Sequence, residues 1–326
     1  MLSIIVPVFN ESEVLPEFHR RLTAALGALP CSTEIIYIND GSTDGTQAFL
    51  ESLASATGVG VISFSRNFGK EAAMTAGLDH ATGSAVVVID ADLQDPPELI
   101  ASLYERYAAG GVDVVYAKRR TRAGESWLKR ITSKTFYRVI RRLATVEIPT
   151  DTGDFRLMSR RAVEALKRLG ERRRFMKGLF AWIGFPTASV EYDRDPRNAG
   201  QTKWRYWKLW NFALEGITSF TTAPLRLATY LGLIFAGVSG VYGLYIIIRT
   251  LIFGADMSGY PSIFTAILFF GGTQLFFLGV IGEYLGRVFD EAKARPLYIV
   301  LSWQPPEEVS PVRNRASAVS TPELGS

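Results

Sequence analysis

Two long apolar runs in the C-terminal third of the chain constrain its fold more than any other feature. Residues 227–248 and 257–282 contain no Asp, Glu, Lys or Arg. Each run exceeds the roughly 20 residues that a helix needs to cross a hydrocarbon core of about 30 Å. A buried helix of a soluble protein is the alternative, but two such runs in succession favour a transmembrane hairpin. We therefore predict membrane-spanning helices at 225–250 and 261–285.

The charges around these runs predict the orientation of the hairpin. The stretch between them, residues 254–259, contains no Lys or Arg, whereas basic residues are abundant before the first run and after the second. Positively charged segments stay on the cytoplasmic side of a membrane. We therefore expect a multi-pass protein of the inner (plasma) membrane with its catalytic domain and both termini in the cytoplasm. Arg249, near the outer end of the first span, departs from this pattern but is long enough to extend to the interface.

The N-terminal part of the chain alternates between strand and helix patterns. Apolar, β-rich runs occupy residues 2–8, 34–38, 59–64, 85–89 and 112–116, and helix-like segments separate them at 13–29, 43–56, 70–81 and 97–109. Gly83 and Gly110 are expected at helix ends. Alternation at this spacing is typical of a parallel sheet with helices on its faces. We predict an α/β domain over residues 1–200 with a mainly parallel sheet.

Two further segments flank the predicted hairpin. Trp204, Trp207 and Trp210 alternate with basic residues just ahead of the first span. This composition is typical of a helix that lies in the membrane interface, so we predict an interfacial amphipathic helix at 201–224. Residues 286–326 are expected to form a cytoplasmic C-terminal segment. From about Gln304 this segment is rich in Pro, Ser, Glu and Arg, which predicts a disordered tail.

Polar residues follow the predicted strands, at the sheet edge where ligands of parallel α/β proteins bind. The sharpest signal is Asp90-Ala91-Asp92, directly after the fourth strand. Two carboxylates in this position suit a divalent cation that bridges a diphosphate. The chain has one cysteine and two histidines, which favours Mg²⁺ or Mn²⁺ over zinc. Neither the dinucleotide-binding glycine pattern nor a Walker A sequence is present.

Basic residues cluster in two runs. Residues 118–142 contain ten basic residues and one acidic residue, and residues 156–177 contain nine and two. Such runs suit the phosphates of nucleic acid, anionic lipid or a phosphorylated substrate, although solvated helix faces have the same composition. Their place beside a membrane anchor favours lipid or substrate phosphate, and we expect no nucleic-acid partner.

The stretch after the second predicted strand has the spacing of a calcium-binding loop, with Asp40, Ser42, Asp44, Gly45 and Glu51 in the ligand positions. An EF-hand needs an entering helix, but a strand pattern precedes this loop. We interpret it as a nucleotide-contacting turn. A non-catalytic, membrane-tethered nucleotide or calcium binder is the alternative.

Several motifs together resemble a known family. They are VPVFNE at 6–11, NDGSTDG at 39–45, DADLQDPPE at 90–98, DTGDFR at 151–156, RNAGQTKW at 197–204, GEYLGR at 282–287 and RPLY at 295–298. In these motifs the chain is similar, over about residues 1–300, to the inverting glycosyltransferases of family 2. Within that family it looks like the polyprenyl-phosphate glycosyltransferases, particularly the bactoprenol glucosyltransferases and dolichol-phosphate mannose synthases. The resemblance implies a GT-A nucleotide-sugar-binding domain followed by a two-helix transmembrane hairpin.

The resemblance also implies roles for individual residues. The base and ribose of the nucleotide would be held by Pro7, Phe9, Glu11 and Asp40. The metal and the diphosphate would be held by Asp90, Asp92 and Gln94. Asp154 matches an acidic residue at the reacting centre, and we expect Asp154 and Asp92 to be catalytic.

The remaining predicted site residues are basic or polar. The nucleotide-sugar set also includes Lys70 and Arg119, and Arg119 lies in the stretch that matches the lipid-phosphate site as well. The predicted lipid-phosphate set comprises Lys129, Arg130, Ser133, Arg197 and Lys203, the last two on a loop beside the site.

The implied reaction is the transfer of a sugar to a polyprenyl phosphate such as undecaprenyl phosphate. A phosphate monoester is mostly dianionic at neutral pH, so it can attack the sugar without strong general-base help. One direct displacement at the sugar carbon inverts the anomeric centre. UDP-glucose is the leading donor, with GDP-mannose, N-acetylhexosamine and modified arabinose donors left open. A processive polysaccharide synthase would have more spans and a Gln-x-x-Arg-Trp motif, which residues 201–205 do not match. We also expect a homo-oligomer, for example a tetramer.

Overall fold

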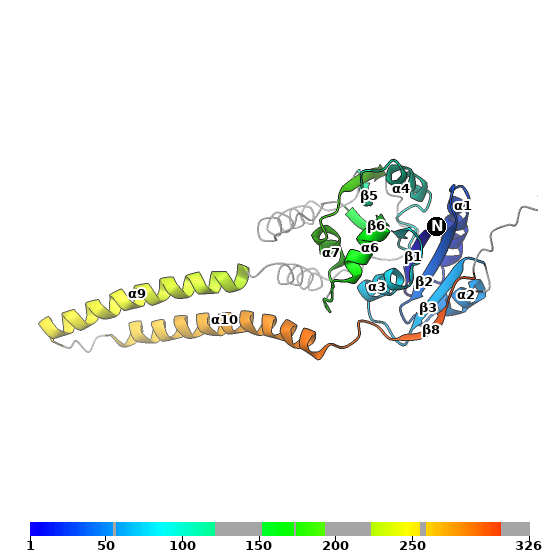
Figure 1. Ribbon diagram of the computed structural model, residues 1–326. Coiled ribbons are helices and arrows are strands. Elements are labelled where there is room, and N and C mark those ends of the chain that lie inside the picture. Colours follow the sequence, from blue (N-terminus) through cyan, green and yellow to red (C-terminus); the bar gives the residue numbers. More distant parts are fainter. Residues whose placement is uncertain (55–56, 121–151, 173, 193–222, 255–258, 308–326) are drawn as a thin grey trace, which may run out of the picture.

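The computed structural model describes residues 1–54, 57–120, 152–172, 174–192, 223–254 and 259–307. Within them the chain forms an α/β domain and two long helices that run side by side away from it (Figure 1). The predicted interfacial helix at 201–224 lies almost entirely outside the described residues, and so does most of the predicted tail.

The strands of the described part form one eight-stranded sheet in the order β7-β5-β6-β4-β1-β2-β3-β8. In chain order they are β1 (Leu2–Val8), β2 (Thr33–Asn39), β3 (Val59–Phe64), β4 (Ala85–Val88), β5 (Val114–Arg119), β6 (Thr152–Ser159), β7 (Thr187–Tyr192) and β8 (Val300–Gln304). The central strands β4, β1, β2 and β3 are parallel to one another. Strand β6 is antiparallel to both neighbours, and β8 is antiparallel to β3.

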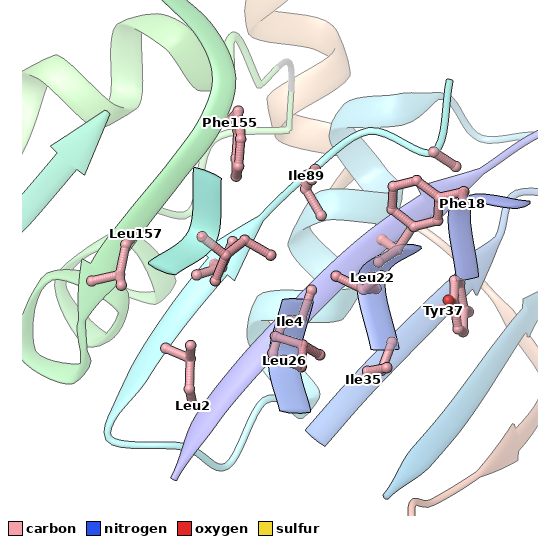
Figure 2. Packing of buried hydrophobic residues seen from close by; sticks show 14 of the residues in the cluster. Leu2, Ile4, Phe18, Leu22, Leu26, Ile35, Tyr37, Ile89, Phe155 and Leu157 are labelled. Carbon is pink, nitrogen blue, oxygen red and sulfur yellow. The ribbon is translucent and has the colours of Figure 1, made fainter. Parts of the chain in front are cut away.

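Helices cover both faces of this sheet. They are α1 (Leu15–Gly27), α2 (Thr46–Leu53), α3 (Lys70–His80), α4 (Leu99–Ala108), α6 (Arg160–Lys167) and α7 (Met176–Trp182). Alternate residues of β1 serve different faces, since Ile4 belongs to the core under α1, α2 and α4, whereas Ile5 packs with α3, α6 and α7. Figure 2 shows the first of these cores, where Phe18 and Leu22 of α1 lie over Ile4 and Tyr37. Both faces are buried, which explains the continuous apolar runs of the central strands.

The predicted fold class is confirmed in its architecture: the domain is α/β with a mostly parallel sheet. Strands β6, β7 and β8 were not predicted. Gly110 follows the end of α4 with a φ of +79°, as expected of a glycine after a helix. Gly83 has a different reason, because a Cβ there would lie 2.6 Å from the Ser3 Oγ atom. The chain just before β4 approaches β1 too closely for a side chain at position 83.

The two long helices are α9 (Ala223–Phe253) and α10 (Tyr260–Lys293). Phe235 of α9 packs edge-on against Phe269 and Phe270 of α10. Among the described residues, one helix is long and apolar enough to cross a membrane, namely residues Leu227–Phe253 of α9, with a mean hydropathy of 2.1. The second predicted span, 261–285, lies within α10, which continues to Lys293.

The segment after α10 returns to the α/β domain. Its strand β8 pairs with the edge strand β3, with Trp303 opposite Ile62. Tyr298 stacks on Phe64 at 5.0 Å between ring centroids and donates a 2.8 Å hydrogen bond to Asp79 of α3. The first part of the predicted C-terminal segment is therefore an ordered part of the sheet, up to Gln304.

Candidate active site

A cleft of about 430 Å³ opens at the carboxyl ends of the central strands. The loops after β1, β2, β3 and β4 form its walls. Among its lining residues are seven of the predicted site residues: Pro7, Phe9, Glu11, Asp40, Lys70, Asp90 and Asp92. Its size lies in the range of small-molecule sites, and its position follows the rule for open parallel sheets.

One side of the cleft is built by the ends of β1 and β2. The Phe9 side chain is 44% exposed, so an aromatic ring is available to a planar group. Asp40 is buried, and its carboxylate accepts hydrogen bonds from the backbone N–H groups of Phe68 at 2.6 Å and Gly69 at 2.9 Å. Burial raises the pKa of Asp40 while these bonds oppose the shift. Asp40 thus fixes the loop that leads into α3.

The centre of the cleft is a charge cluster from three elements. The Lys70 ammonium, at the start of α3, lies 2.7 Å from the Asp90 carboxylate and 2.5 Å from the Asp154 carboxylate. Burial alone would lower the pKa of Lys70, but the charges of Asp90 and Asp154 outweigh it and raise the pKa above its ordinary value. Burial opposes ionisation of Asp154, but Lys70 and Lys177 hold its pKa below the ordinary value. Asp154 is therefore ionised at neutral pH.

The residues after β4 offer oxygen ligands of the kind that a divalent cation prefers. The backbone N–H of Gln94 donates to Asp92 at 3.1 Å, and the buried Gln94 Nε2 atom has no hydrogen-bond partner among the described residues. No group of three or more His, Cys, Asp or Glu side chains in the described ranges is arranged to hold a metal ion by itself. Mg²⁺ typically binds one or two carboxylates and completes its shell with water and substrate phosphates. Asp90 and Asp92 fit an ion that binds together with a diphosphate.

A second polar cluster lies next to Gly153 and Asp154, outside the residues that line the cleft. Arg119, at the end of β5, donates from Nε to the Tyr192 hydroxyl at 3.2 Å, and its guanidinium lies 3.6 Å from the Asp95 carboxylate. The Tyr192 hydroxyl donates to the same Asp95 carboxylate. Arg119 was predicted, but Tyr192 and the role of Asp95 were not. Asp95 and Tyr192 are 97 residues apart, so no local motif connects them.

Burial shifts the pKa of two groups near Asp154, namely Arg156 and Glu71. Arg156 donates to the carbonyl oxygens of Gly153 at 2.8 Å and Asp154 at 3.2 Å, and its guanidinium lies 3.7 Å from the centre of the Phe180 ring. Burial lowers the pKa of Arg156 to about 10. Burial raises the pKa of Glu71 to about 8, and the charge of Asp154 adds to that shift. The sequence signalled Arg156 only as part of a motif and did not signal Glu71.

The predicted lipid-phosphate residues Lys129, Arg130, Ser133, Arg197 and Lys203 lie outside the described residues. In the structure, a residue of the calcium-loop pattern stabilises the start of helix α2. The Asp44 carboxylate accepts the backbone N–H groups of Ser12 and Thr46, and α2 begins at Thr46. A strand, not a helix, enters this loop.

A cleft at the strand ends of a GT-A domain, with an Asp-x-Asp pair at its centre, defines the class of protein as a glycosyltransferase. The model for glycosyl transferase family 2 matches residues 3–167, and the model for the GtrB C-terminal hairpin matches residues 223–288. The chain belongs to glycosyl transferase family 2. The hairpin match and the apolar helix α9 further identify it as membrane-associated.

Curated relatives are similar over nearly their whole length. A bactoprenol glucosyl transferase of Shigella phage SfV is 51% identical over 92% of this chain and 97% of its own. A prophage bactoprenol glucosyl transferase homolog of Escherichia coli is 49% identical over 92% and 98%. An uncharacterized glycosyltransferase of Synechocystis sp. is 53% identical over 92% and 94%. Among solved structures, glucosyl-3-phosphoglycerate synthase from Mycobacterium tuberculosis matches with a TM-score of 0.48 and 21% identity, over 67% of this chain and 77% of its own.

Proposed function

We propose that this chain transfers glucose from UDP-glucose to a polyprenyl phosphate at the cytoplasmic face of the membrane. The observation that carries the proposal is the identity of about half of the aligned residues, over 92% of the chain, to proteins named bactoprenol glucosyl transferases. The cleft supports it, because its lining offers an aromatic side chain and a pair of carboxylates, and the ionised Asp154 pairs with Lys70 of that lining.

The donor lies across the strand ends in this proposal. Pro7, Phe9, Glu11 and Asp40 line the part of the cleft that would take the base and ribose. The diphosphate then reaches Asp90 and Asp92 at the end of β4, which places the sugar next to Asp154 of β6. The pairing of β1 with β2 on one side and of β4 with β6 on the other supports this order.

Asp90 and Asp92, with Gln94 beside them, would hold a divalent cation, Mg²⁺ or Mn²⁺. When bound, the ion offsets negative charge on the departing nucleoside diphosphate. Lys70 lies against Asp90 in the structure and supplies a further positive charge at the same place. With the ion bound, positive charge would lie where the leaving group develops negative charge.

The reaction proceeds as one displacement. An oxygen of the acceptor phosphate attacks C1 of the sugar while the bond from C1 to the UDP oxygen breaks, so the anomeric centre inverts. The acceptor is a dianion at neutral pH and needs no proton removed. Asp154 is ionised and carries an oxygen, Oδ1, without a hydrogen-bond partner among the described residues. We assign it the stabilisation of positive charge on the sugar.

The rest of the chain would bring this site to its lipid substrate. In the proposed topology, 1–200 is the cytoplasmic catalytic domain, 201–224 an interfacial helix, 225–250 and 261–285 the membrane spans, and 286–326 a cytoplasmic segment. Lys129, Arg130, Ser133, Arg197 and Lys203 are proposed to bind the lipid phosphate. Two helices alone give little packing within a bilayer, which favours a homo-oligomer in the plasma membrane.

The experiment incubates the detergent-solubilised full chain with undecaprenyl phosphate, Mg²⁺ or Mn²⁺, and a panel of nucleotide sugars. Mass spectrometry of the lipid fraction identifies the product. We expect a hexosyl phospholipid from UDP-glucose that is lost with EDTA and in Asp92→Ala. If only GDP-mannose gave product, the donor would be GDP-mannose and not UDP-glucose. An active Asp92→Ala variant would contradict the metal assignment.

A further inference from the structure

The cluster of Arg119, Asp95 and Tyr192 has a geometry that the proposed reaction scheme leaves unused. Asp95 is 2% exposed and Tyr192 is 6% exposed, whereas the Arg119 side chain is 26% exposed. The two partners are therefore enclosed in the protein, and the guanidinium is the most exposed member of the cluster. A buried carboxylate is strongly destabilising unless it is paired and hydrogen-bonded.

The contacts in this cluster restrict the orientation of Arg119. A guanidinium is planar, so a contact at Nε and a contact at a terminal nitrogen together define its plane. Tyr192 accepts from Nε at 3.2 Å, and Asp95 lies 3.6 Å from a terminal nitrogen. The Tyr192 hydroxyl donates a hydrogen bond to Asp95, so the lone pairs of its oxygen can accept a hydrogen bond from Arg119. The three side chains form a closed set of complementary donors and acceptors.

The position of the cluster indicates what the guanidinium faces. In the sheet order, β5 and β7 lie on the opposite side of β4 from β1 and β2, whose ends form the nucleotide part of the cleft. A Cβ on Gly153, next to Asp154, would lie 3.3 Å from the Arg119 guanidinium. Arg119 is therefore beside the reacting centre but away from the predicted base and ribose. Guanidinium groups bind phosphate oxygens in a bidentate manner.

We propose that Asp95 and Tyr192 are positioning residues that aim the Arg119 guanidinium at the phosphate of the acceptor. The inference deepens the proposed function and rests on it for the identity of the acceptor. The family resemblance already matches Arg119 to the lipid-phosphate stretch, and the new element is the pair of residues that orients it. The inference also explains why a carboxylate is buried beneath a site that binds anions, since Asp95 is neutralised by the arginine that it orients.

The test measures steady-state transfer by the detergent-solubilised full chain with Tyr192→Phe and Asp95→Asn, each at varied acceptor and varied UDP-glucose. Both changes keep the shape of the side chain. We expect the KM for undecaprenyl phosphate to rise roughly tenfold, as for loss of a hydrogen bond to a charged group, with the KM for UDP-glucose unchanged. An equal rise in both KM values, or no rise in either, overturns the inference.

Tyr37→Phe is the matched control. Tyr37 is fully buried in β2 of the same sheet, and its hydroxyl bonds to His19 at 2.8 Å, outside the cluster. The Tyr37→Phe variant also removes one tyrosine hydroxyl, and its KM for undecaprenyl phosphate should equal that of the wild type. In an Arg119→Gln background, Tyr192→Phe should add little further loss, because the group that it positions is gone. Full additivity of the two changes would overturn the positioning role.

A binding measurement separates this inference from the proposed function. Farnesyl phosphate is titrated calorimetrically into the solubilised full chain without UDP-glucose, with farnesol as the phosphate-free control. Weaker binding by Tyr192→Phe and Arg119→Gln supports the inference even if no donor gives product, in which case the proposed function alone fails. Wild-type transfer of glucose together with unchanged farnesyl phosphate binding in both variants overturns the inference alone.

Discussion

Lys70 is the residue on which the charges of the cleft converge. Its ammonium contacts Asp90, a predicted metal ligand, and Asp154, the carboxylate assigned to the sugar. It therefore competes with a cation for Asp90 and holds Asp154 ionised. We predict that Lys70→Met binds Mn²⁺ more tightly, because Asp90 loses its counter-charge, while kcat falls by about a hundredfold, as for loss of a preorganised charged donor. Paramagnetic resonance titration of Mn²⁺ and turnover assays measure the two effects.

The control for this prediction is Lys118→Met. Lys118 is partly exposed, and its ammonium pairs with Glu191 at 3.2 Å. The change removes the same charge from the surface of the domain and should leave Mn²⁺ affinity and kcat near the wild-type values. A Lys70→Met variant with wild-type turnover would show that the ion pairs at the cleft centre have no part in catalysis.

Glu71 predicts a pH dependence of stability. Its pKa is about 8 in the folded protein because of burial, against an ordinary value of 4.5. Between these values the folded state binds a proton that the unfolded state has released, so the free energy of unfolding falls as the pH rises from about 4.5 to 8. Glu71→Gln cannot titrate and should make the decline in Tm across this range less steep, measured in EDTA. The exposed Glu13→Gln change should keep the wild-type slope, and a wild-type slope in Glu71→Gln would contradict the assignment.

At the scale of elements, β8 closes the edge of the sheet beside β3. Gly60 of β3 makes this docking possible, since a Cβ there would lie 2.9 Å from the Trp303 ring and 2.7 Å from the Pro306 ring. We predict that Gly60→Ala destabilises the domain by about 1–3 kcal/mol through overpacking and exposes the end of α10 to trypsin at Lys293. Thermal unfolding and limited proteolysis measure both effects.

Gly27→Ala serves as the control for the docking of β8. Gly27 is the last residue of α1, and a Cβ there meets no atom within 4 Å. This change should leave both Tm and the cleavage pattern near wild type. If Gly60→Ala were cleaved no faster than Gly27→Ala, β8 would not depend on close contact with β3.

The elements that could be predicted from sequence are those with local signals. Strand β1 and its parallel neighbours are apolar on both faces, and α1 and α3 begin and end within a few residues of their predicted bounds. Strand β6 was missed because Asp154 and Arg156 interrupt its apolar pattern. Strand β8 was missed because it pairs with β3 more than 200 residues away, which no local pattern encodes.

The same distinction applies to the site. Asp90 and Asp92 form a compact motif at a strand end, so their place in the cleft follows from the parallel sheet. Tyr192 stands opposite Arg119 in the parallel pairing of β5 with β7, whereas Asp95 lies in the loop after β4, two strands away from β5 in the sheet. Residue identity alone does not reveal such a contact.

At the scale of the whole molecule, α10 connects the proposed membrane span to the catalytic domain. Its last part, residues 283–293, carries charged residues and rises about 16 Å at 1.5 Å per residue. The backbone N–H of Arg172 donates to Glu291 at 2.7 Å, and the Arg172 guanidinium donates to the Arg295 carbonyl at 2.7 Å. These two hydrogen bonds and the pairing of β8 with β3 attach the chain to the α/β domain both at the end of α10 and after it. The proposed hairpin therefore holds the cleft at a defined distance from the lipid surface.

The proposed topology makes a prediction that uses the single cysteine of the chain. Cys31 is half-buried in the loop before β2 and lies in the proposed cytoplasmic domain. A membrane-impermeant maleimide should label it in spheroplasts only after permeabilisation. A second cysteine, Met257→Cys in a Cys31→Ser background, lies between α9 and α10 and should be labelled in intact spheroplasts. Labelling of position 257 only after permeabilisation would place the loop in the cytoplasm, and the hairpin could not cross the membrane as proposed.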